Sequence, residues 1–130
     1  MHHTLIGGQL ALPNGTKLPL SKASRAGDFV FLSGQLGLGA DGKLAGDDIK
    51  TQTRQTIENI KSLLTDAGSD LSDVIKATVW LTDTGNFAAF NEIYAEYFST
   101  NPPPRSAVCS ALMLPGALVE IEVIAYCPES

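Results

Sequence analysis

The sequence predicts an α+β fold in which a mixed β-sheet carries two helices packed on one of its faces. Two segments, about Asp48–Ala67 and Phe87–Phe98, repeat apolar residues at helical spacing. Short runs rich in β-branched and aromatic residues stand before, between and after these segments. Strands and helices in this order are typical of an α+β sheet. At 130 residues the chain has the length of one domain, and we predict a single domain over residues 1–130.

Two strands are expected before the first helix. Thr4–Leu12 is a weak strand candidate that ends at the turn signal Pro13-Asn14-Gly15. Phe29–Leu32 is a short run of residues with high β-propensity. The following segment, Gly34 to Gly46, holds five glycines, and Asp41-Gly42 within it predicts a hairpin turn.

The first helix is expected to begin after an Asp47 or Asp48 N-cap and to end at Gly68. Its apolar face consists of Ile49, Thr53, Ile57, Ile60, Leu64 and Ala67. The second helix carries an aromatic stripe made of Phe87, Phe90, Tyr94, Tyr97 and Phe98. Three prolines, Pro102–Pro104, exclude a longer helix and deliver an extended chain into the next strand.

Three more strands are expected, over Val74–Leu81, Arg105–Leu112 and Leu118–Tyr126. With both helices on one face of the sheet, nothing in the chain covers the other face. Only 18% of the residues are charged, against about 25% in typical domains. Both observations predict that the protein associates with itself.

The composition also excludes some classes of partner. The net charge of −5 argues against nucleic acids and anionic membranes, because both are bound through Lys and Arg. No apolar run approaches the ~20 residues of a membrane span, and no signal peptide is recognisable. Cys109 and Cys127 lack metal-binding spacing, so we expect reduced thiols in a cytoplasmic protein.

Several motifs carry no function. Gly37–Gly42 reads GxGxxG, but no helix opens at its third glycine, so a glycine-rich hairpin is favoured over a dinucleotide site. The only histidines, His2 and His3, stand at the amino terminus, which leaves no His base for nucleophilic catalysis. Two cysteines and two terminal histidines also lack the spacing of a zinc site, so no metal is expected.

Two charged residues are the main candidates for chemistry. Arg105 follows the three prolines, and a guanidinium held there can clamp a carboxylate in bidentate fashion; the alternative is a surface Arg at a strand edge. Glu120 shares a strand face with Glu122, flanked by Leu118, Ile124 and Tyr126. Such surroundings raise the pKa of a carboxyl group and suit it to act as a base; the alternative is a solvated strand face.

Weaker candidates lie nearby. Asn91 interrupts the aromatic stripe, either as a helix-edge polar residue or as an amide aimed at a site. Gly34 allows a ligand to approach the backbone closely and Ser33 offers a donor, unless the pair is only a bend that ends a strand. Cys109 shares strand parity with Arg105, although a small packed residue is the favoured interpretation.

Taken together, these residues resemble the Rid family of reactive intermediate deaminases, also called the YjgF or L-PSP endoribonuclease family. The most specific matches are Pro104-Arg105-Ser106-Ala107-Val108 and Val119-Glu120-Ile121-Glu122. Phe31–Gln35, Gln52–Gln55 and Asn86–Asn91 match in order upstream. The resemblance extends from Pro19 to Ala125.

The resemblance implies a chorismate-mutase-like fold and a homotrimer with sites between its subunits. It implies that Arg105 binds a substrate carboxylate, that Glu120 activates water, and that Ser33, Gly34 and Asn91 line the pocket. The implied reaction is the hydrolysis of 2-amino-enoic or 2-imino acids to 2-oxo acids and ammonium, without cofactor or metal. An oriented water and a carboxylate clamp suffice for such reactive substrates.

The sequence departs from many deaminating members at two positions. Leu20 stands where those members have Tyr, and Ala107 where they have Cys, so both positions affect the expected pocket and its substrate. Two alternatives stay open: a specialised catabolic deaminase, similar to 2-aminomuconate deaminase or RutC, and a non-catalytic regulatory trimer that binds small carboxylates. A ribonuclease fits the acidic composition poorly.

Overall fold

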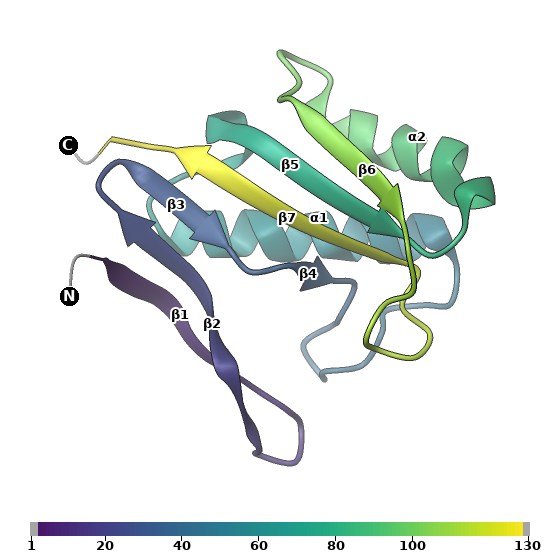
Figure 1. Cartoon of the computed structure of the whole chain (residues 1–130), viewed down its shortest axis with the longest axis horizontal. Helices are drawn as coiled ribbons and strands as arrows, with labels where there is room; N and C mark the ends of the chain where they lie inside the picture. Colours follow the sequence, from purple (N-terminus) through teal and green to yellow (C-terminus); the bar gives the residue numbers. More distant parts are fainter. Residues whose placement is uncertain (1–2, 129–130) are drawn as a thin grey trace.

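The computed structural model describes residues 3–128 as a sheet in one layer and two helices in the other (Figure 1). The predicted α+β class is confirmed. The sheet has seven strands in the described residues, in the order β1-β2-β3-β7-β5-β6, with the short β4 pairing to β7. The strands are β1 (Thr4–Ala11), β2 (Lys17–Ala26), β3 (Phe29–Leu32), β4 (Gln35–Leu36), β5 (Val74–Leu81), β6 (Arg105–Cys109) and β7 (Val119–Tyr126).

The sheet is mixed. Strand β6 runs parallel to β5, and all other pairings are antiparallel. The parallel pairing follows from the connection, because α2 (Phe87–Phe98) carries the chain from the end of β5 back to the start of β6. The outer position of β6 leaves Arg105, its first residue, at the sheet edge beside α2.

Helix α1 (Ile49–Asp66) begins and ends at the signals predicted for it. The Asp48 side chain accepts a hydrogen bond from the Thr51 N–H and caps the helix, and Gly68 follows its end with φ of +80°. The predicted apolar face is confirmed, since Ile57, Ile60 and Leu64 are fully buried against the sheet.

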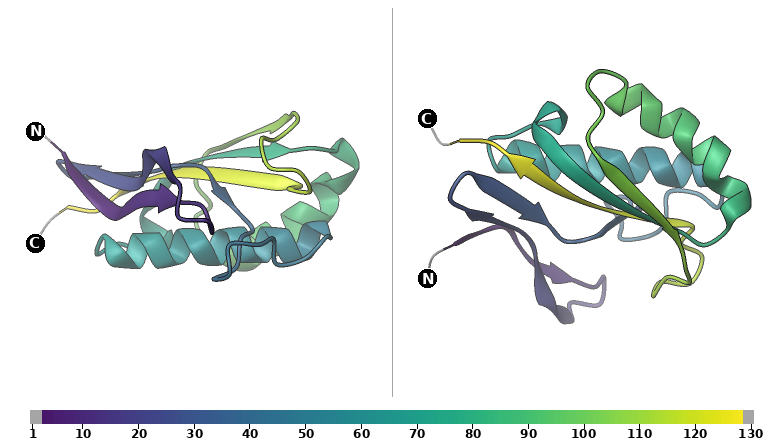
Figure 2. Two further views of the ribbon diagram at one scale, coloured as in Figure 1. Left: turned by 90° about the horizontal axis from the view of Figure 1, so that it is seen from below. Right: turned by 45° about the horizontal axis from the view of Figure 1, so that its top comes forward.

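Both helices pack on the same face of the sheet, as an edge-on view shows (Figure 2). Residues alternate accordingly along β7: Val119, Ile121, Val123 and Ala125 are buried, while Glu120, Glu122, Ile124 and Tyr126 lie on the face that the helices leave bare. That bare face carries the rings of Phe29, Phe31 and Tyr126, each about two-fifths exposed. The prediction that nothing in the chain covers this face is confirmed for the described residues.

The sequence reasoning missed β2 and β4. Strand β2 contains Pro19 and a polar run, Ser21–Lys22 with Ser24–Arg25, which lowers its β-propensity. It forms because β1 and β3 pair with it on both sides. Strand β4 has only two residues, too few for any periodicity. The glycine-rich segment after it turns at Gly42, as predicted, and closes with a bridge between Leu38 and Leu44.

Three smaller expectations need correction. Strand β6 ends at Cys109 rather than Leu112, since the chain turns away to form the segment 110–118. Phe87 and Tyr97 are not buried with the rest of the aromatic stripe, and Tyr97 instead donates a hydrogen bond to Glu58 on α1. Cys109 is exposed rather than packed, because α2 does not cover the end of β6.

His2 and the ends of the predicted 1–130 domain, residues 1–2 and 129–130, lie outside the described residues. Within residues 3–128, neither helix has the length and apolar composition needed to span a bilayer.

Candidate functional site

Arg105 is held by α2. Its Nη1 donates a hydrogen bond of 2.9 Å to Oδ1 of Asn91. Its guanidinium carbon lies 4.8 Å from the ring centre of Tyr94, 5.5 Å from that of Phe90 and 5.6 Å from that of Phe87. These rings favour a cation over their faces. Arg105 is therefore a half-buried, oriented cation, and not a freely moving surface side chain.

The register of β6 decides which side of the sheet Arg105 faces. Arg105 lies opposite Ala77 on β5, and Ala77 is completely buried beneath the helices. Ala107, two residues later, shares this face of β6 and is exposed. Arg105, Asn91 and Ala107 thus form one group, which we call the arginine group.

Glu120 lies on the opposite face of the sheet. It pairs with Trp80 on β5 and with Leu36 on β4. Its carboxylate lies against Gly34, where an added Cβ would collide with Oε2. Only glycine leaves that space free, so Gly34 allows the carboxylate to lie directly against the backbone.

The surroundings of Glu120 change its acidity. Burial raises the pKa of Glu120, and the negative charge of Glu122 on the same strand face raises it further. A carboxylate with a raised pKa holds a proton more readily and is a better base near neutral pH. This agrees with the expectation drawn from the apolar neighbours of Glu120.

Ser33, the residue before Gly34, is tied to the backbone of β2. Its Oγ donates a hydrogen bond of 2.7 Å to the carbonyl of Ser21, the residue after Leu20. Leu20 is about two-fifths exposed. We call Leu20, Ser33, Gly34 and Glu120 the glutamate group.

One chain does not bring the two groups together. Arg105 is on β6 and Glu120 is on β7, with β5 between them, and the two residues lie on opposite faces of the sheet. Their partners on β5, Ala77 and Trp80, are three residues apart. Strand spacing and residue rise place their backbones about 14 Å apart. A small substrate bound to Arg105 therefore cannot reach Glu120 of the same chain.

A hollow of about 360 Å³ opens on the bare face beside the glutamate group. Phe31, Ser33, Glu122 and Ile124 are among its lining residues. The described lining includes His3 but no Arg or Lys, so it offers a bound carboxylate no permanent cation.

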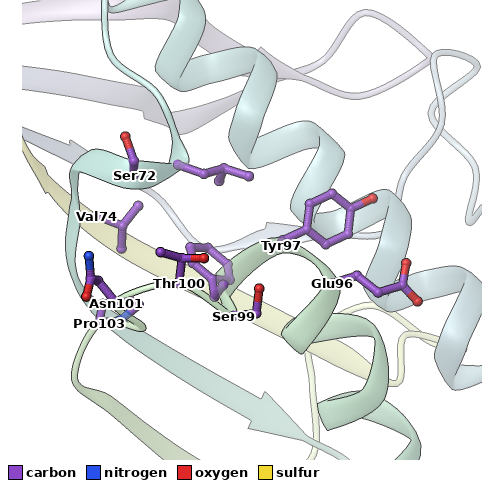
Figure 3. Close-up of a pocket in the computed structure, with 10 residues that line it drawn as sticks. Ser72, Val74, Glu96, Tyr97, Ser99, Thr100, Asn101 and Pro103 are labelled. Carbon is purple, nitrogen blue, oxygen red and sulfur yellow. The ribbon is translucent and has the colours of Figure 1, made fainter.

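A second hollow, of about 390 Å³, lies at the end of α2 (Figure 3). Its side chains come from residues 71–74, from the end of α2 and from the segment 99–103. They include hydroxyl groups and the Asn101 amide, but none of the predicted site residues and no cation. This hollow is unsuited to a carboxylate substrate.

Some residues of the site were not identified from the sequence as site residues. Phe87, Phe90 and Tyr94 were interpreted only as a packing stripe, although they surround Arg105. Their spacing with Asn91 was a usable signal, because positions 87, 91 and 94 lie on one helix face. Across residues 3–128, no three His, Cys, Asp or Glu side chains are grouped to hold a metal ion.

Comparison with known proteins gives the family. The model of the family described as Endoribonuclease L-PSP matches residues 13–127. A RutC family protein of Pyrococcus horikoshii is 49% identical over 109 residues, which cover 83% of this chain and 86% of that protein. Reactive Intermediate Deaminase A, chloroplastic, of Arabidopsis thaliana is 42% identical over 108 residues, covering 82% of this chain and 58% of that protein.

Solved structures agree. A crystal structure described as an endoribonuclease L-PSP from Entamoeba histolytica superposes with a TM-score of 0.85 at 38% identity, covering 95% of this chain and 98% of that one. The sequence match and the shared fold agree with the resemblance found in the segments around Arg105 and Glu120. The chain therefore belongs to the L-PSP endoribonuclease family, which includes RutC family proteins and reactive intermediate deaminases.

Proposed function

We propose that this protein is an enamine/imine deaminase that hydrolyses 2-imino and 2-amino-enoic acids to 2-oxo acids and ammonium. The observation that carries the proposal is the Glu120 carboxylate, which is half-buried against Gly34 and has a raised pKa. This is the state that a general base needs near neutral pH. The Arabidopsis relative named as a reactive intermediate deaminase supports the same reaction class.

The proposed chemistry needs few groups. The Arg105 guanidinium pairs with the substrate carboxylate, and Asn91 keeps the guanidinium in place. Glu120 takes a proton from water as the water oxygen bonds to the imine carbon. Addition to the protonated imine gives a carbinolamine, and the proton passes from Glu120 to its nitrogen. The C–N bond then breaks as the hydroxyl oxygen forms the carbonyl and gives its own proton, through Glu120, to the departing ammonia, which leaves a 2-oxo acid and ammonium. A 2-amino-enoic acid enters as its imine tautomer. Ser33, Gly34, Leu20 and Ala107 would shape the pocket around the substrate.

The proposal requires more than one chain, because Arg105 and Glu120 of one chain lie on opposite faces of the sheet. We propose a homotrimer in which the arginine group of one subunit meets the glutamate group of its neighbour. The exposed rings of Phe29, Phe31 and Tyr126 support burial of the bare face against another copy.

The free thiols of Cys109 and Cys127 support a reducing, cytoplasmic location.

The proposal is tested by generating imines in the assay. An amino-acid oxidase produces 2-imino acids from several amino acids, and semicarbazide competes for them. Wild-type protein is expected to suppress semicarbazone formation, and Arg105→Ala is expected to lose that effect. Arg54→Ala is the matched control, since Arg54 is an exposed arginine paired with Glu96 on the helical layer.

Two outcomes separate the alternatives. If semicarbazone formation is suppressed for one unusual substrate only, a specialised catabolic deaminase is favoured. The observation behind this alternative is that Leu20 and Ala107 replace the Tyr and Cys of many deaminating members. Tight binding of 2-oxo acids without any suppression would overturn the deaminase and leave a carboxylate-binding protein.

A further inference from the structure

The buried face of α1 carries polar side chains where its neighbours are loops. Most buried positions on this helix are apolar and pack against strands. Two amide side chains differ: Gln52, which is buried, and Asn59, which is half-buried. They lie seven residues apart, two helical turns, and therefore on one side of the helix. Burying an amide group costs free energy unless its hydrogen bonds are made, so the partners of these two residues show what they hold.

Gln52 holds the entry to β7. It is completely buried. Its Nε2 donates to the carbonyl of Gly46 at 2.9 Å and to that of Gly116 at 3.0 Å, and its Oε1 accepts from the N–H of Leu118 at 2.8 Å. Leu118 comes just before β7 and two residues before Glu120. Gln52 thus joins the helix directly to the backbone that leads into Glu120.

Asn59 holds the other neighbour of Glu120. Its Nδ2 donates to the carbonyls of Leu36 at 3.0 Å and Leu38 at 2.8 Å. Leu36 is the residue of β4 that pairs with Glu120. Because β4 has only two residues, its own ladder is a weak anchor. Gln55 donates a hydrogen bond of 2.8 Å to Oδ1 of Asn59, which turns the Nδ2 group toward the carbonyls.

The two amides therefore hold two backbone segments next to Glu120, the start of its own strand β7 and the neighbouring strand β4. Gln52 fixes the position of the start of β7, and Asn59 fixes the position of β4, the strand that follows Gly34. The Glu120 carboxylate lies against Gly34. We infer that Gln52 and Asn59 are positioning residues that hold Glu120 and the backbone at Gly34 in the relative positions that catalysis requires. This inference deepens the proposed function and rests on Glu120 as its base.

The experiment compares Gln52→Met and Asn59→Ala with Thr56→Val. Met has nearly the length of Gln but forms none of its three hydrogen bonds. Thr56 is the matched control, because it is completely buried on α1 and its hydroxyl bonds only within the helix, to the carbonyl of Gln52 at 2.7 Å. A general weakening of α1 would appear in all three variants.

Two readouts distinguish positioning from structural support. The first readout is the carbon-13 NMR signal of the Glu120 carboxyl group, which is assigned by its loss in Glu120→Gln. This signal is expected to titrate at lower pH in Gln52→Met and Asn59→Ala, because a less tightly held backbone lets water reach the carboxyl group. In imine hydrolysis, kcat is expected to fall about 10- to 100-fold, a range typical of supporting residues, while KM stays within about twofold because the arginine group is untouched. Thr56→Val is expected to lower thermal stability only.

Each result decides something. If titration and kcat in Gln52→Met and Asn59→Ala match those of Thr56→Val, the amides support the fold alone and the inference is overturned. If the Glu120 titration moves but wild-type protein hydrolyses no imine, the positioning stands and the proposed function fails. Should Gln52→Met not fold, Asn59→Ala decides, together with the milder Gln55→Ala, which removes only the bond that orients Asn59.

Discussion

Two glutamates two residues apart on β7 have different surroundings. Both lie on the bare face, but Glu120 is half-buried between β4 and β5 while Glu122 is exposed. The charge of Glu122 adds to the burial of Glu120 and raises the pKa of Glu120 further. One acidic strand face thus yields a single carboxyl group with the properties of a base.

Replacing Glu120 by Gln should raise stability as it abolishes activity. A folded-state pKa above the ordinary 4.5 means that the folded protein binds this proton more tightly than the unfolded chain does. Stability is therefore lost as pH rises from about 4.5 through the folded pKa. We expect a higher Tm for Glu120→Gln than for wild type at pH 7, and no gain well below pH 4.5. Equal Tm differences at both pH values, measured by calorimetry, would contradict this origin.

Gly34→Ala should displace the carboxylate without unfolding the chain. The added Cβ would meet the end of the flexible Glu120 side chain, and Gly34 does not have a positive φ. A displacement on the scale of 1 Å lowers kcat/KM on the order of 10²-fold. Gly39→Ala is the control, because the nearest atom to its Cβ is Oδ1 of Asp41 at 3.3 Å. Unchanged kinetics in Gly34→Ala would show that the Glu120 position is unimportant.

At the scale of elements, β6 supplies Arg105 and α2 supplies everything that orients it. The three prolines before β6 bring the chain to the sheet edge, where the Pro104 carbonyl accepts a hydrogen bond from the Ala77 N–H. Helix α2 then places Asn91 and three aromatic rings around the guanidinium. The connection between β5 and β6 therefore forms half of the proposed site.

Asn91→Ala should weaken substrate binding more than turnover. A net hydrogen bond to a charged group is worth about 1.5–3 kcal/mol, so its loss at Arg105 is expected to raise KM about 10-fold or more. Glu92→Ala is the neighbouring control, since Glu92 pairs with Lys50 in an exposed ion pair on the helical layer. Steady-state kinetics on imines measure both variants. A fall in kcat at constant KM would assign Asn91 a role in chemistry rather than in holding the clamp.

The elements differ in how well the sequence predicted them. Both helices and the strands β5 and β7 follow their periodicity to within one residue at each end, because burial on one face imposes the pattern. Strand β2 has no such pattern. Its backbone is held by β1 and β3, and this pairing between distant segments compensates for the weak propensity of Lys22, Ser24 and Arg25.

At the scale of the whole molecule, the proposed homotrimer accounts for both the bare sheet face and the separation of Arg105 from Glu120. A second copy on that face would cover the exposed rings, and it could also bring Arg105 of one subunit to Glu120 of another. Residues 3–128 contain both halves of the proposed site, but they lie on opposite faces of the sheet.

Mixing inactive subunits tests this arrangement. Arg105→Ala and Glu120→Gln are each expected to be inactive alone. In trimers assembled at random from both, about one quarter of the sites between neighbours combine an intact Arg105 with an intact Glu120. We therefore expect about a quarter of wild-type activity from the unselected co-expressed mixture. Mixed trimers purified through two affinity tags should have about a third, because each of them contains one complete site in three.

The control co-expresses Arg105→Ala with the Arg105→Ala, Glu120→Gln double variant, which regenerates no complete site. Inactive mixed trimers, with their composition verified by native mass spectrometry, would exclude a site shared in this way between neighbouring subunits.

The sequence by itself determined the layers and the candidate groups. The order of the elements predicted both helices on one face. Local chemistry made Arg105, Asn91 and Glu120 candidates, because capping, alternation and proline stiffness act within a few residues. Only the tertiary structure decided that Arg105 and Glu120 face opposite ways, that Gly34 makes room for the carboxylate, and that Gln52 and Asn59 hold the backbone on either side of it. Those relations depend on strand register and on hydrogen bonds between segments 20 to 70 residues apart, which no local pattern encodes.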